Sequence, residues 1–508
     1  EIAEEGIVLL KNDGTLPLAA DSNLNVFGWA STNPCYGGTG SGALSDAYPT
    51  VSLLQGLEDA GFNLNTELSD FYTAYRADRP EVGMWAQDWT LPEPTADSYT
   101  DEMMANAKEF SDTAMVVITR VGGEGADLPT DVSKVTYTDN STEYKDFEAG
   151  EHYLQLDRTE RDMLDLVCSN FDNVIVVYNG ANAMELGFIN EYSQIKSAIW
   201  CPGTGQSGFE ALGEIVAGTV NPSGKTSDTF VADLTATPTW NNFGYFKYDN
   251  MDEYAYTSNN FKTGEEETAL PSFVNYVDGI YVGYRFYETA AAEGLINYDD
   301  TVVYPFGYGL SYTTFTQEMG AISEDNGTIS FDVTVTNTGD VAGKDVVEVY
   351  YNPPYTNGGI EKASANLIQF EKTEVLQPGD SQTITVSFDA EDMASYDTYG
   401  AGCYVLEAGD YQISINSDSH NVIDSQTYTV ASTVTYDESN PRSTDETAAV
   451  NEFAYAEGDV TYLSRADGFA NYADATAAPA SMSMSDEAKA TFLNNSNYNP
   501  EDYNNDSD

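Results

Sequence analysis

Ala114-Met-Val-Val-Ile-Thr119 is the stretch that decides the predicted fold, together with a second run of the same kind, Asn173-Val-Ile-Val-Val-Tyr178. Both runs are short, apolar and rich in β-branched residues, which is typical of strands buried on both faces of a sheet. Helix-like stretches alternate with such runs, for example over residues 51–60 and 158–170. The alternation indicates an α/β domain with a mainly parallel sheet over residues 1–235.

A glutamate follows the first strand closely, in Arg120-Val-Gly-Gly-Glu124-Gly-Ala-Asp127. The strand can hold this turn rigidly, and the glycines on both sides allow a ligand to approach the backbone. General acid catalysis needs a group within hydrogen-bond reach of a leaving oxygen, so Glu124 is a candidate proton donor. An acidic loop without any function has the same local appearance, and the choice depends on the rest of the chain.

A second glycine-rich loop, Gly37-Gly-Thr-Gly-Ser-Gly42, follows the strand-like segment 25–28. Ligands of mainly parallel sheets bind beyond the carboxyl ends of the strands. We therefore expect this loop and Glu124 to reach the same rim of the sheet. The loop lacks the spacing and the following lysine of a phosphate-binding loop, so no nucleotide is expected there.

The composition argues against several kinds of partner. The 508 residues suffice for two or three domains, and they include 83 acidic and only 20 basic residues, a formal net charge of −63. This charge would repel nucleic acids and anionic membranes, so neither is expected as a partner and a neutral ligand is favoured. No apolar run is long enough to cross a membrane, and no signal peptide is evident. A secreted or cell-surface bacterial protein is somewhat favoured over a cytoplasmic one.

Few residues are available for nucleophilic or metal chemistry. His152 and His420 are the only histidines, and the four cysteines show no metal-like spacing. With so few histidines, a Ser-His-Asp triad or a Cys-His dyad is not expected, and neither is a metal or another cofactor. We expect the cysteines to be buried free thiols. Carboxylate chemistry remains as the candidate.

The remainder of the chain divides into three parts. Residues 236–318, rich in Tyr, Phe, Asn and Gly, predict an extended segment that wraps between domains. Residues 319–432 contain short runs in which inward and outward residues alternate, such as 329–336, and predict an all-β sandwich. Residues 433–508 are expected to form an acidic linker or tail.

The ordered motifs of the chain resemble the non-barrel part of glycoside hydrolase family 3, whose best-known members are β-glucosidases. In chain order the motifs are Glu5-Gly-Ile-Val-Leu-Leu-Lys-Asn-Asp-Gly14, the loop 37–42, the loop 119–127, Asn221-Pro-Ser-Gly-Lys225, Gly283-Tyr-Arg-Phe-Tyr287 and Pro305-Phe-Gly-Tyr-Gly-Leu-Ser-Tyr-Thr-Thr-Phe315. No single string decides the matter, but their shared order is strong evidence. The resemblance implies an α/β sandwich domain followed by a fibronectin-type-III-like sandwich.

The resemblance also implies roles for individual residues. In that family a (β/α)8 barrel supplies an Asp nucleophile, and the α/β sandwich supplies the acid/base glutamate, which by resemblance is Glu124. Burial in the assembled site should raise the pKa of Glu124 towards neutrality. Gly40 and Ser41 would contact sugar hydroxyls, and Asp127 would be a further substrate-binding residue.

Three positions leave alternatives open. Trp85 and Trp89 could form an aromatic platform for an outer sugar, but packing in the core or on the surface is an equally good interpretation. Leu128 stands where the family often has arginine, which puts the fine structure of the acid/base loop in doubt.

The sequence contains no barrel and no convincing nucleophile motif, and its domain order resembles the family's subset in which the barrel comes last. The expected function is therefore the acid/base-supplying part of a retaining, exo-acting β-glycosidase, with β-glucosidase as the default. It would act on a β-glycoside or oligosaccharide with a (β/α)8 barrel on another chain or region, and the assembled enzyme could be a homo-oligomer. A non-catalytic carbohydrate-binding or scaffold subunit is the alternative, and a purely structural surface protein is a third interpretation.

Overall fold

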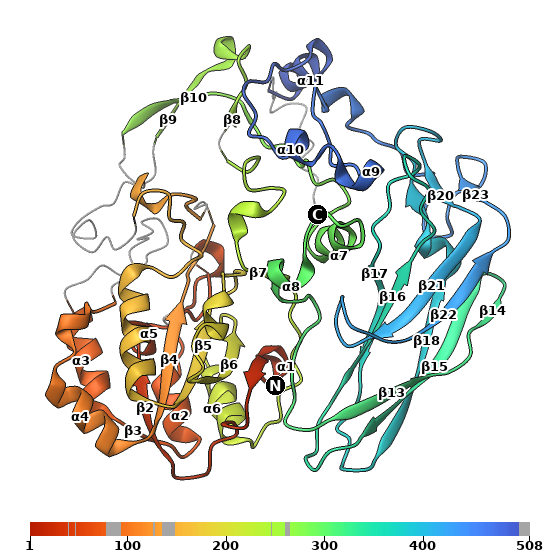
Figure 1. Ribbon diagram of the computed structural model, residues 1–508. Helices are drawn as coiled ribbons and strands as arrows, with labels where there is room; N and C mark the ends of the chain where they lie inside the picture. Colours follow the sequence, from red (N-terminus) through yellow and green to blue (C-terminus); the bar gives the residue numbers. More distant parts are fainter. Residues whose placement is uncertain are drawn as a thin grey trace.

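The computed structural model contains two domains that long crossing segments connect (Figure 1). The α/β domain lies at the lower left of the view and the β-sandwich at the right, while the last helices return to the top. The structure describes residues 1–38, 40–45, 47–77, 93–124, 128–134, 148–244, 246–259 and 265–496.

The α/β domain is built on a six-stranded sheet with the strand order β1-β6-β5-β4-β2-β3. Strands β2 to β6 are parallel, and β1 pairs antiparallel with β6 at one edge. The strands span Val8–Asn12 (β1), Asn23–Phe27 (β2), Asn63–Leu64 (β3), Thr113–Thr119 (β4), Asn173–Asn179 (β5) and Ile195–Cys201 (β6). The predicted mainly parallel sheet is confirmed, and the edge strand β1 departs from the common direction.

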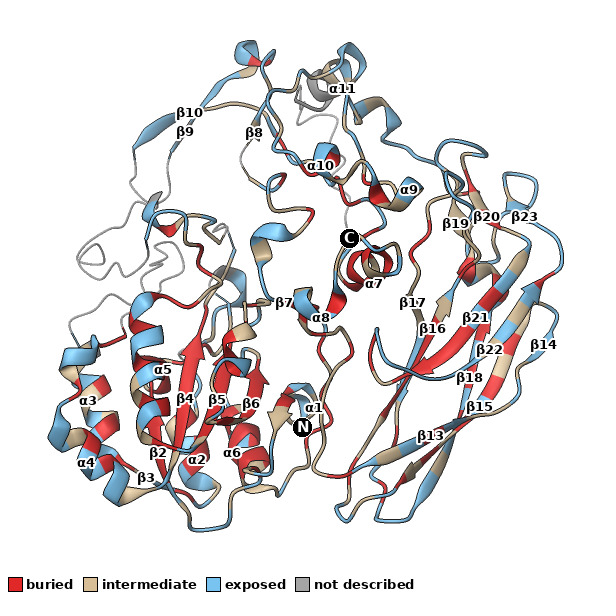
Figure 2. Cartoon of the chain, in the orientation of Figure 1, coloured by how far each residue is buried: buried red, intermediate tan, exposed pale blue. Residues whose placement is uncertain are grey.

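Helices flank this sheet, whose central strands are apolar on both faces. After their first residue, β4 and β5 are buried throughout (Figure 2). Two of the helices pack so closely that a Cβ on Gly213 would lie 2.0 Å from the carbonyl oxygen of Gly56, so this contact requires glycine. The helices are α1 (Ile2–Gly6), α2 (Leu53–Asp59), α3 (Thr66–Arg76), α4 (Asp101–Phe110), α5 (Arg158–Asn170) and α6 (Phe209–Ala217).

The segment 236–318 is more structured than the extended linker that the sequence predicted. Its described residues include two α-helices, and one of its strands pairs with β7, which follows the α/β sheet. Burial of Phe286 and Tyr287 in an apolar cluster of their own holds the first helix between the domains (Figure 1). Strand β7 spans Phe230–Val231, before the segment. The elements of the segment are β8 (Phe246–Lys247), β9 (Tyr256–Asn259), β10 (Glu266–Ala269), β11 (Ser272–Phe273), α7 (Tyr284–Ala292), α8 (Tyr298–Thr301) and β12 (Val302–Tyr304).

The β-sandwich runs from Phe315 to Tyr436, against predicted limits of 319 and 432. In one sheet β15 pairs with β13, β14 and β18, a second has the order β17-β16-β21-β22, and a small third has the order β19-β20-β23. Buried residues alternate with less buried ones along β15, as the sequence pattern predicted. The strands are β13 (Phe315–Met319), β14 (Ser323–Asp325), β15 (Thr328–Asn337), β16 (Val346–Asn352), β17 (Asn366–Lys372), β18 (Ser381–Asp389), β19 (Ser395–Tyr396), β20 (Tyr404–Leu406), β21 (Gly409–Asn416), β22 (Val422–Val430) and β23 (Val434–Tyr436).

The described part of the predicted tail, 437–496, packs against the rest of the protein. It contains α9 (Ala466–Phe469), α10 (Tyr472–Ala475) and α11 (Asp486–Ser496). Phe469 is 1% exposed, and its ring centroid lies 5.9 Å from that of Phe286 on α7. The helices α9 and α10 are too short to show an apolar period, which is why the sequence did not predict them.

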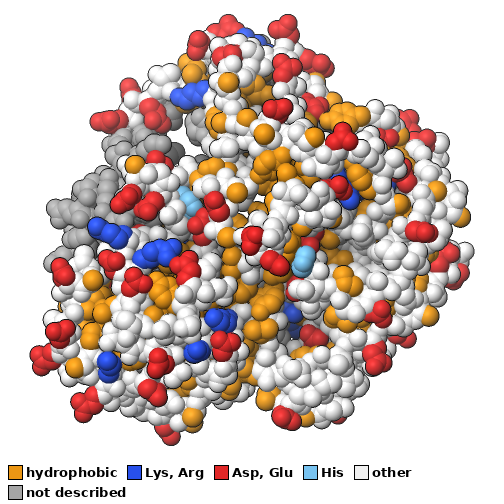
Figure 3. Space-filling view, in the orientation of Figure 1, with side chains coloured by type: hydrophobic (Ala, Val, Ile, Leu, Met, Phe, Trp, Pro, Cys, Tyr) orange, Lys and Arg blue, Asp and Glu red, His pale blue; other side chains and the backbone are white. Residues whose placement is uncertain are grey.

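The surface is acidic and the cysteines are inside. Asp and Glu side chains are scattered over both domains, whereas hydrophobic side chains gather along the junction between the domains (Figure 3). Cys35, Cys168, Cys201 and Cys403 are all buried and free, as predicted. Within the described ranges, no helix combines the length and the apolar character that crossing a membrane requires.

Polar contacts lock the α/β domain to the sandwich. Glu5, near the end of α1, accepts hydrogen bonds from Lys344 at 2.5 Å and from Lys372 at 2.7 Å. Asn221 donates to the carbonyl oxygen of Ala342 at 3.0 Å. The sandwich is therefore held by residues from both ends of the α/β domain.

A buried carboxyl group also lies at this junction, and it makes stability depend on pH. Glu348 on β16 is 4% exposed and accepts a hydrogen bond from the hydroxyl of Tyr350 at 2.8 Å. Burial raises the pKa of Glu348 to about 8, and nearby Lys225 only partly opposes this. Because the folded pKa lies above the ordinary value of 4.5, the stability that this group contributes is fully present below pH 4.5 and is lost as the pH rises to about 8.

Glu348→Gln should therefore stabilise the protein at pH 8, because the amide keeps the shape of the side chain without its charge. We expect a gain of about 2 kcal/mol at pH 8, which is less than half of what the full pKa shift would give. At pH 5 the variant should lie within about 0.5 kcal/mol of the unchanged protein. Urea unfolding at the two pH values measures both quantities, and equal stabilities at pH 8 would contradict the assignment.

Candidate functional site

One buried asparagine organises the rim at the carboxyl ends of the parallel strands. Asn179, the last residue of β5, accepts a hydrogen bond from the amide of Cys35 at 2.5 Å. Its side chain donates to the carbonyl oxygens of Cys35 at 3.1 Å and Cys201 at 3.0 Å. The hydroxyl of Thr119, at the end of β4, donates to the Asn179 carbonyl at 2.7 Å. Asn179 thus connects the loops that follow β2, β4 and β6.

The loop that follows β6 holds the glycine-rich loop 37–42 in position. The amide of Gly205 donates to the carbonyl of Tyr36 at 2.6 Å. A Cβ on Gly203 would lie 3.1 Å from the Cα of Gly37 and 3.2 Å from the Tyr36 carbonyl oxygen. A side chain at Gly203 would therefore fit only if the backbone at Tyr36 and Gly37 moved by a few tenths of an ångström.

Gly203→Ala should therefore displace the glycine-rich loop. We expect a loss of about 1–3 kcal/mol in the free energy of unfolding, together with faster amide hydrogen exchange over residues 36–38 and 40–42. The control is Gly187→Ala, where the nearest atom to an added Cβ would be 3.9 Å away, and where the change should stay below about 1 kcal/mol. Equal effects of the two substitutions would show that the loop is not held by this contact.

The two loops that were expected to share a rim do meet there. The amide of Ser41, within the turn Gly40–Gly42, donates to Oε2 of Glu124 at 2.8 Å, and the Ser41 hydroxyl donates to the same oxygen. Glu124 is exposed, and the hydroxyl and amide of Ser41 lower its pKa below the ordinary value. In this chain the Glu124 carboxyl is an anion, and the rise in pKa that general acid catalysis needs requires burial that the described residues do not supply.

A buried ion pair anchors the start of the Glu124 loop. Arg120 is fully buried, and its two terminal nitrogens each lie 2.8 Å from an oxygen of Glu160 in the first turn of α5. Arg120 also donates to the carbonyls of Tyr153 at 2.6 Å and Gln155 at 2.5 Å. Burial alone would lower the pKa of Arg120, but the Glu160 carboxylate raises it, so the guanidinium stays charged. This pairing ties the residue that precedes the loop to the sheet domain.

A cavity of about 530 Å³ opens beside the Glu124 loop. Backbone from both glycine-rich loops and two aromatic side chains form its wall, including Gly37, Gly38, Gly122, Gly123, Trp240 and Phe243. Its size falls in the range of small-molecule pockets, and the glycines leave backbone groups accessible. Phe243 is 53% exposed, so its ring faces space that is open in this chain.

Histidine 152 supports the aromatic wall. Its Nδ1 accepts a hydrogen bond from the Leu154 amide at 3.1 Å, so in the neutral ring the proton is on Nε2, which lies 2.9 Å from Glu185. The Trp240 ring packs edge-on against His152 with a centroid distance of 5.1 Å. His152 is thus a positioning residue, and in the described ranges no three His, Cys, Asp or Glu side chains form a group suited to a metal ion.

The predicted site residues divide into two groups. Glu124, Ser41 and Gly40 lie on the rim that the structure describes. Trp85, Trp89 and Asp127 lie outside the described residues, so their predicted roles stay predictions.

The sequence interpretation missed Asn179, Trp240 and Phe243. Asn179 could have been found, because it is a polar residue at the end of an apolar strand. Trp240 and Phe243 lie in a segment that was interpreted as a linker.

A mainly parallel sheet with a carboxylate and a glycine-rich loop on one rim, followed by a fibronectin-like sandwich, defines a class of two-domain units found in glycoside hydrolases. Sequence profiles agree with this class. The profile of the glycosyl hydrolase family 3 C-terminal domain matches residues 7–312, and that of the fibronectin type III-like domain matches residues 345–419. The chain belongs to glycosyl hydrolase family 3.

Similar proteins include β-glucosidases from several bacteria. The chain is 33% identical over 448 residues to β-glucosidase A of Butyrivibrio fibrisolvens, covering 82% of this chain and 49% of that protein. It is 31% identical over 440 residues to a β-glucosidase of Ruminococcus albus, covering 85% of this chain and 40% of that protein. The chain therefore spans about half the length of the relatives it matches.

Solved structures resemble the fold over the same part of the chain. A β-glucosidase from Paenibacillus barengoltzii superposes with a TM-score of 0.69 at 31% identity, covering 85% of this chain and 43% of that one. β-Glucosidase 3B from Thermotoga neapolitana, solved in complex with α-D-glucose, gives a TM-score of 0.68 at 27% identity, covering 85% and 54%. The fold is thus that of the corresponding parts of these enzymes.

Proposed function

We propose that this chain supplies the acid/base side of a retaining, exo-acting β-glycosidase, with β-glucosidase as the expected specificity. The observation that carries the proposal is the contact between Ser41 and Glu124, whose loops also contribute Gly37, Gly38, Gly122 and Gly123 to the wall of a sugar-sized cavity. The names of the similar proteins support the substrate class. A (β/α)8 barrel on another chain or region would supply the Asp nucleophile.

In this mechanism Glu124 has two tasks. As an acid it protonates the glycosidic oxygen while the nucleophile attacks the sugar, and as a base it then deprotonates the water that releases the covalent intermediate. The first task needs a protonated carboxyl, whereas Ser41 now lowers the pKa of Glu124. A sugar hydroxyl that accepts the Ser41 hydrogen bond would free Glu124 from this influence, and burial by the barrel would raise its pKa.

The cavity wall suits a sugar. Backbone amides and carbonyls at Gly37, Gly38 and Gly122 can bond to hydroxyl groups, and the rings of Trp240 and Phe243 can pack on the CH groups of a sugar face. Among the described residues that line the cavity, Arg120 is the cationic one, and its guanidinium already bonds to Glu160. A neutral glycoside therefore fits this wall better than an anionic ligand does.

The proposal is tested by amide hydrogen exchange on the protein with and without its barrel. If the barrel closes over the rim, amides of residues 40–42 and 121–124 should exchange at least tenfold more slowly in the assembled protein, while those of the distant strand β14 should not change. If the barrel binds but the amides of residues 40–42 and 121–124 exchange as fast as before, the proposed arrangement is contradicted.

The exposure of Glu124 favours a second candidate function, a non-catalytic carbohydrate-binding or scaffold subunit. An exposed, anionic carboxyl is what a subunit that never meets a nucleophile would have. In that case the assembled protein would bind glycosides at the rim but would hydrolyse none of them, whatever the leaving group. Hydrolysis that depends on Glu124 separates the two functions.

A further inference from the structure

A second groove, of about 890 Å³, lies between the β-sandwich and the segment that follows it. One wall is the loop 396–401 and the other is the segment 457–466, with residues 279–281 and 358–361 between them. None of the residues that line this groove also lines the rim cavity. The groove is therefore separate from the proposed catalytic site.

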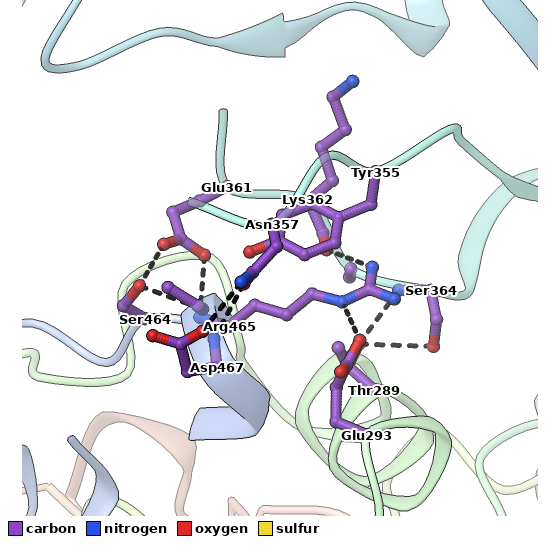
Figure 4. Close-up of polar contacts among 12 residues, drawn as sticks. Thr289, Glu293, Tyr355, Asn357, Glu361, Lys362, Ser364, Ser464, Arg465 and Asp467 are labelled. Carbon is purple, nitrogen blue, oxygen red and sulfur yellow. Dashed lines mark hydrogen bonds and ion pairs between the residues drawn. The ribbon is translucent and has the colours of Figure 1, made fainter. Parts of the chain in front are cut away.

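Polar contacts hold one wall of the groove in place (Figure 4). The Glu361 carboxylate accepts hydrogen bonds from the Ser464 hydroxyl at 2.5 Å and from the Arg465 amide at 2.9 Å, and the Tyr281 hydroxyl donates to it as well. The side chains of Asn357 and Asp467 bond to each other at 2.7 Å. Segments more than 100 residues apart in sequence are thus fixed side by side.

Arg465 adds a second anchor to the same wall. Its Nε donates to Glu293, the residue directly after α7, at 2.7 Å, and a terminal nitrogen donates to the Lys362 carbonyl at 3.0 Å. The guanidinium also stacks over the Tyr355 ring at 4.2 Å from its centroid (Figure 4). These contacts fix the wall of the groove, so a ligand that binds there would order few further side chains and lose little conformational entropy.

The groove presents tyrosines and carboxylates to solvent. Tyr399 is 81% exposed, and Tyr396 and Tyr462 are half-buried. Partial burial raises the pKa of both Tyr399 and Tyr462, and the nearby carboxylate of Glu457 adds to the rise in each. The acidic side chains in the groove wall are Glu361, Asp397, Glu407 and Glu457, and neither Lys nor Arg is among the described lining residues.

We propose that this groove is a carbohydrate-binding site for a neutral oligosaccharide chain, separate from the catalytic rim. Tyrosine rings offer faces on which sugar CH groups pack, and carboxylates are strong acceptors for sugar hydroxyls. The negative lining of a strongly acidic protein repels anionic ligands, so a neutral chain is favoured over a phosphorylated or sulfated one. The volume suits a bound segment of a few sugar units.

Such a site would keep the protein on a polymeric substrate between catalytic events. Binding of a polysaccharide at the groove raises its effective concentration near the catalytic rim, even when each contact is weak. The inference does not rest on the proposed catalytic function, because binding at the groove needs neither Glu124 nor the barrel.

The test is calorimetric titration of the protein with cellohexaose and laminarihexaose. The variants are Tyr399→Ala and Tyr462→Ala in the groove, Glu124→Gln at the rim, and Tyr256→Ala as a matched control, because Tyr256 is 59% exposed on β9 outside the groove. We expect Tyr399→Ala to weaken binding by about tenfold, as loss of one aromatic contact does, and Tyr462→Ala to weaken it similarly. Tyr256→Ala and Glu124→Gln should each leave a binding isotherm at the groove unchanged.

Two results would overturn the inference. One is the absence of binding by the unchanged protein to either oligosaccharide at millimolar concentrations. The other is binding that both groove variants retain in full, which would assign it to the rim or to another surface. Neither result bears on Glu124-dependent hydrolysis, so this proposal and the proposed function can fail independently.

Discussion

Glu124→Gln should reduce the hydrolysis of cellobiose and alkyl glucosides by the assembled enzyme about 10²–10⁴-fold. These substrates have poor leaving groups and need a proton from the enzyme. From a dinitrophenyl glucoside the dinitrophenolate leaves without protonation. The rate of glycosylation with this substrate should therefore fall far less than the rate with cellobiose. The ratio of kcat/KM values for the two substrates is therefore the quantity to measure, because a general loss of folding would lower both values equally.

The control for this experiment is Glu102→Gln on α4, which removes an exposed acid elsewhere on the same domain and should leave both substrates unaffected. The pH profile gives a second readout. If Glu124 is the acid, the alkaline limb of kcat/KM for cellobiose should disappear in Glu124→Gln. Undiminished activity of the variant on both substrates would remove Glu124 from the mechanism.

Glu160→Gln should destabilise the α/β domain by about 3–5 kcal/mol, because it leaves the fully buried guanidinium of Arg120 without its counter-charge. Denaturant unfolding measures the loss. Since Arg120 directly precedes the Glu124 loop, the same variant should also speed amide exchange at residues 121–124.

The chain offers a matched control for this ion pair. Arg161 and Glu191 form a similar pair at 3.0 Å, but their side chains are 48% and 55% exposed. Glu191→Gln should therefore cost no more than about 1 kcal/mol. Replacing both buried partners, as Arg120→Met with Glu160→Leu, should recover part of the stability. Equal costs for Glu160→Gln and Glu191→Gln would show that burial does not govern the strength of these pairs.

The fold was predictable where local patterns and tertiary burial agree. The apolar runs 114–119 and 173–178 became the central strands β4 and β5, and the alternating run 329–336 lies within β15. Helices α9 and α10 were missed because they are too short to show an apolar period, and α7 was missed because its position depends on long-range packing of Phe286 against Phe469.

The rim was predictable only in part. Loops after parallel strands meet at one edge whatever their sequence, so the meeting of Ser41 with Glu124 followed from topology and the glycine-rich pattern. The partners of Asn179 and the exposure of Phe243 depend on chain segments that sequence spacing does not bring together. The lowered pKa of Glu124 depends on two hydrogen bonds from Ser41, which no pattern of residue types reveals.

The contacts of Glu5 with Lys344 and Lys372 have a consequence for how the molecule melts. Glu5 in the first helix bonds to the β-sandwich, and Arg465 bonds to Glu293 at the end of α7. The α/β domain and the β-sandwich are therefore not independent folding units. Heating should give a single calorimetric peak for both modules, and excising either one should leave the other with an unsatisfied, aggregation-prone face. A chimaera that exchanges one of these domains for that of a relative would have to keep the residues on both sides of these contacts.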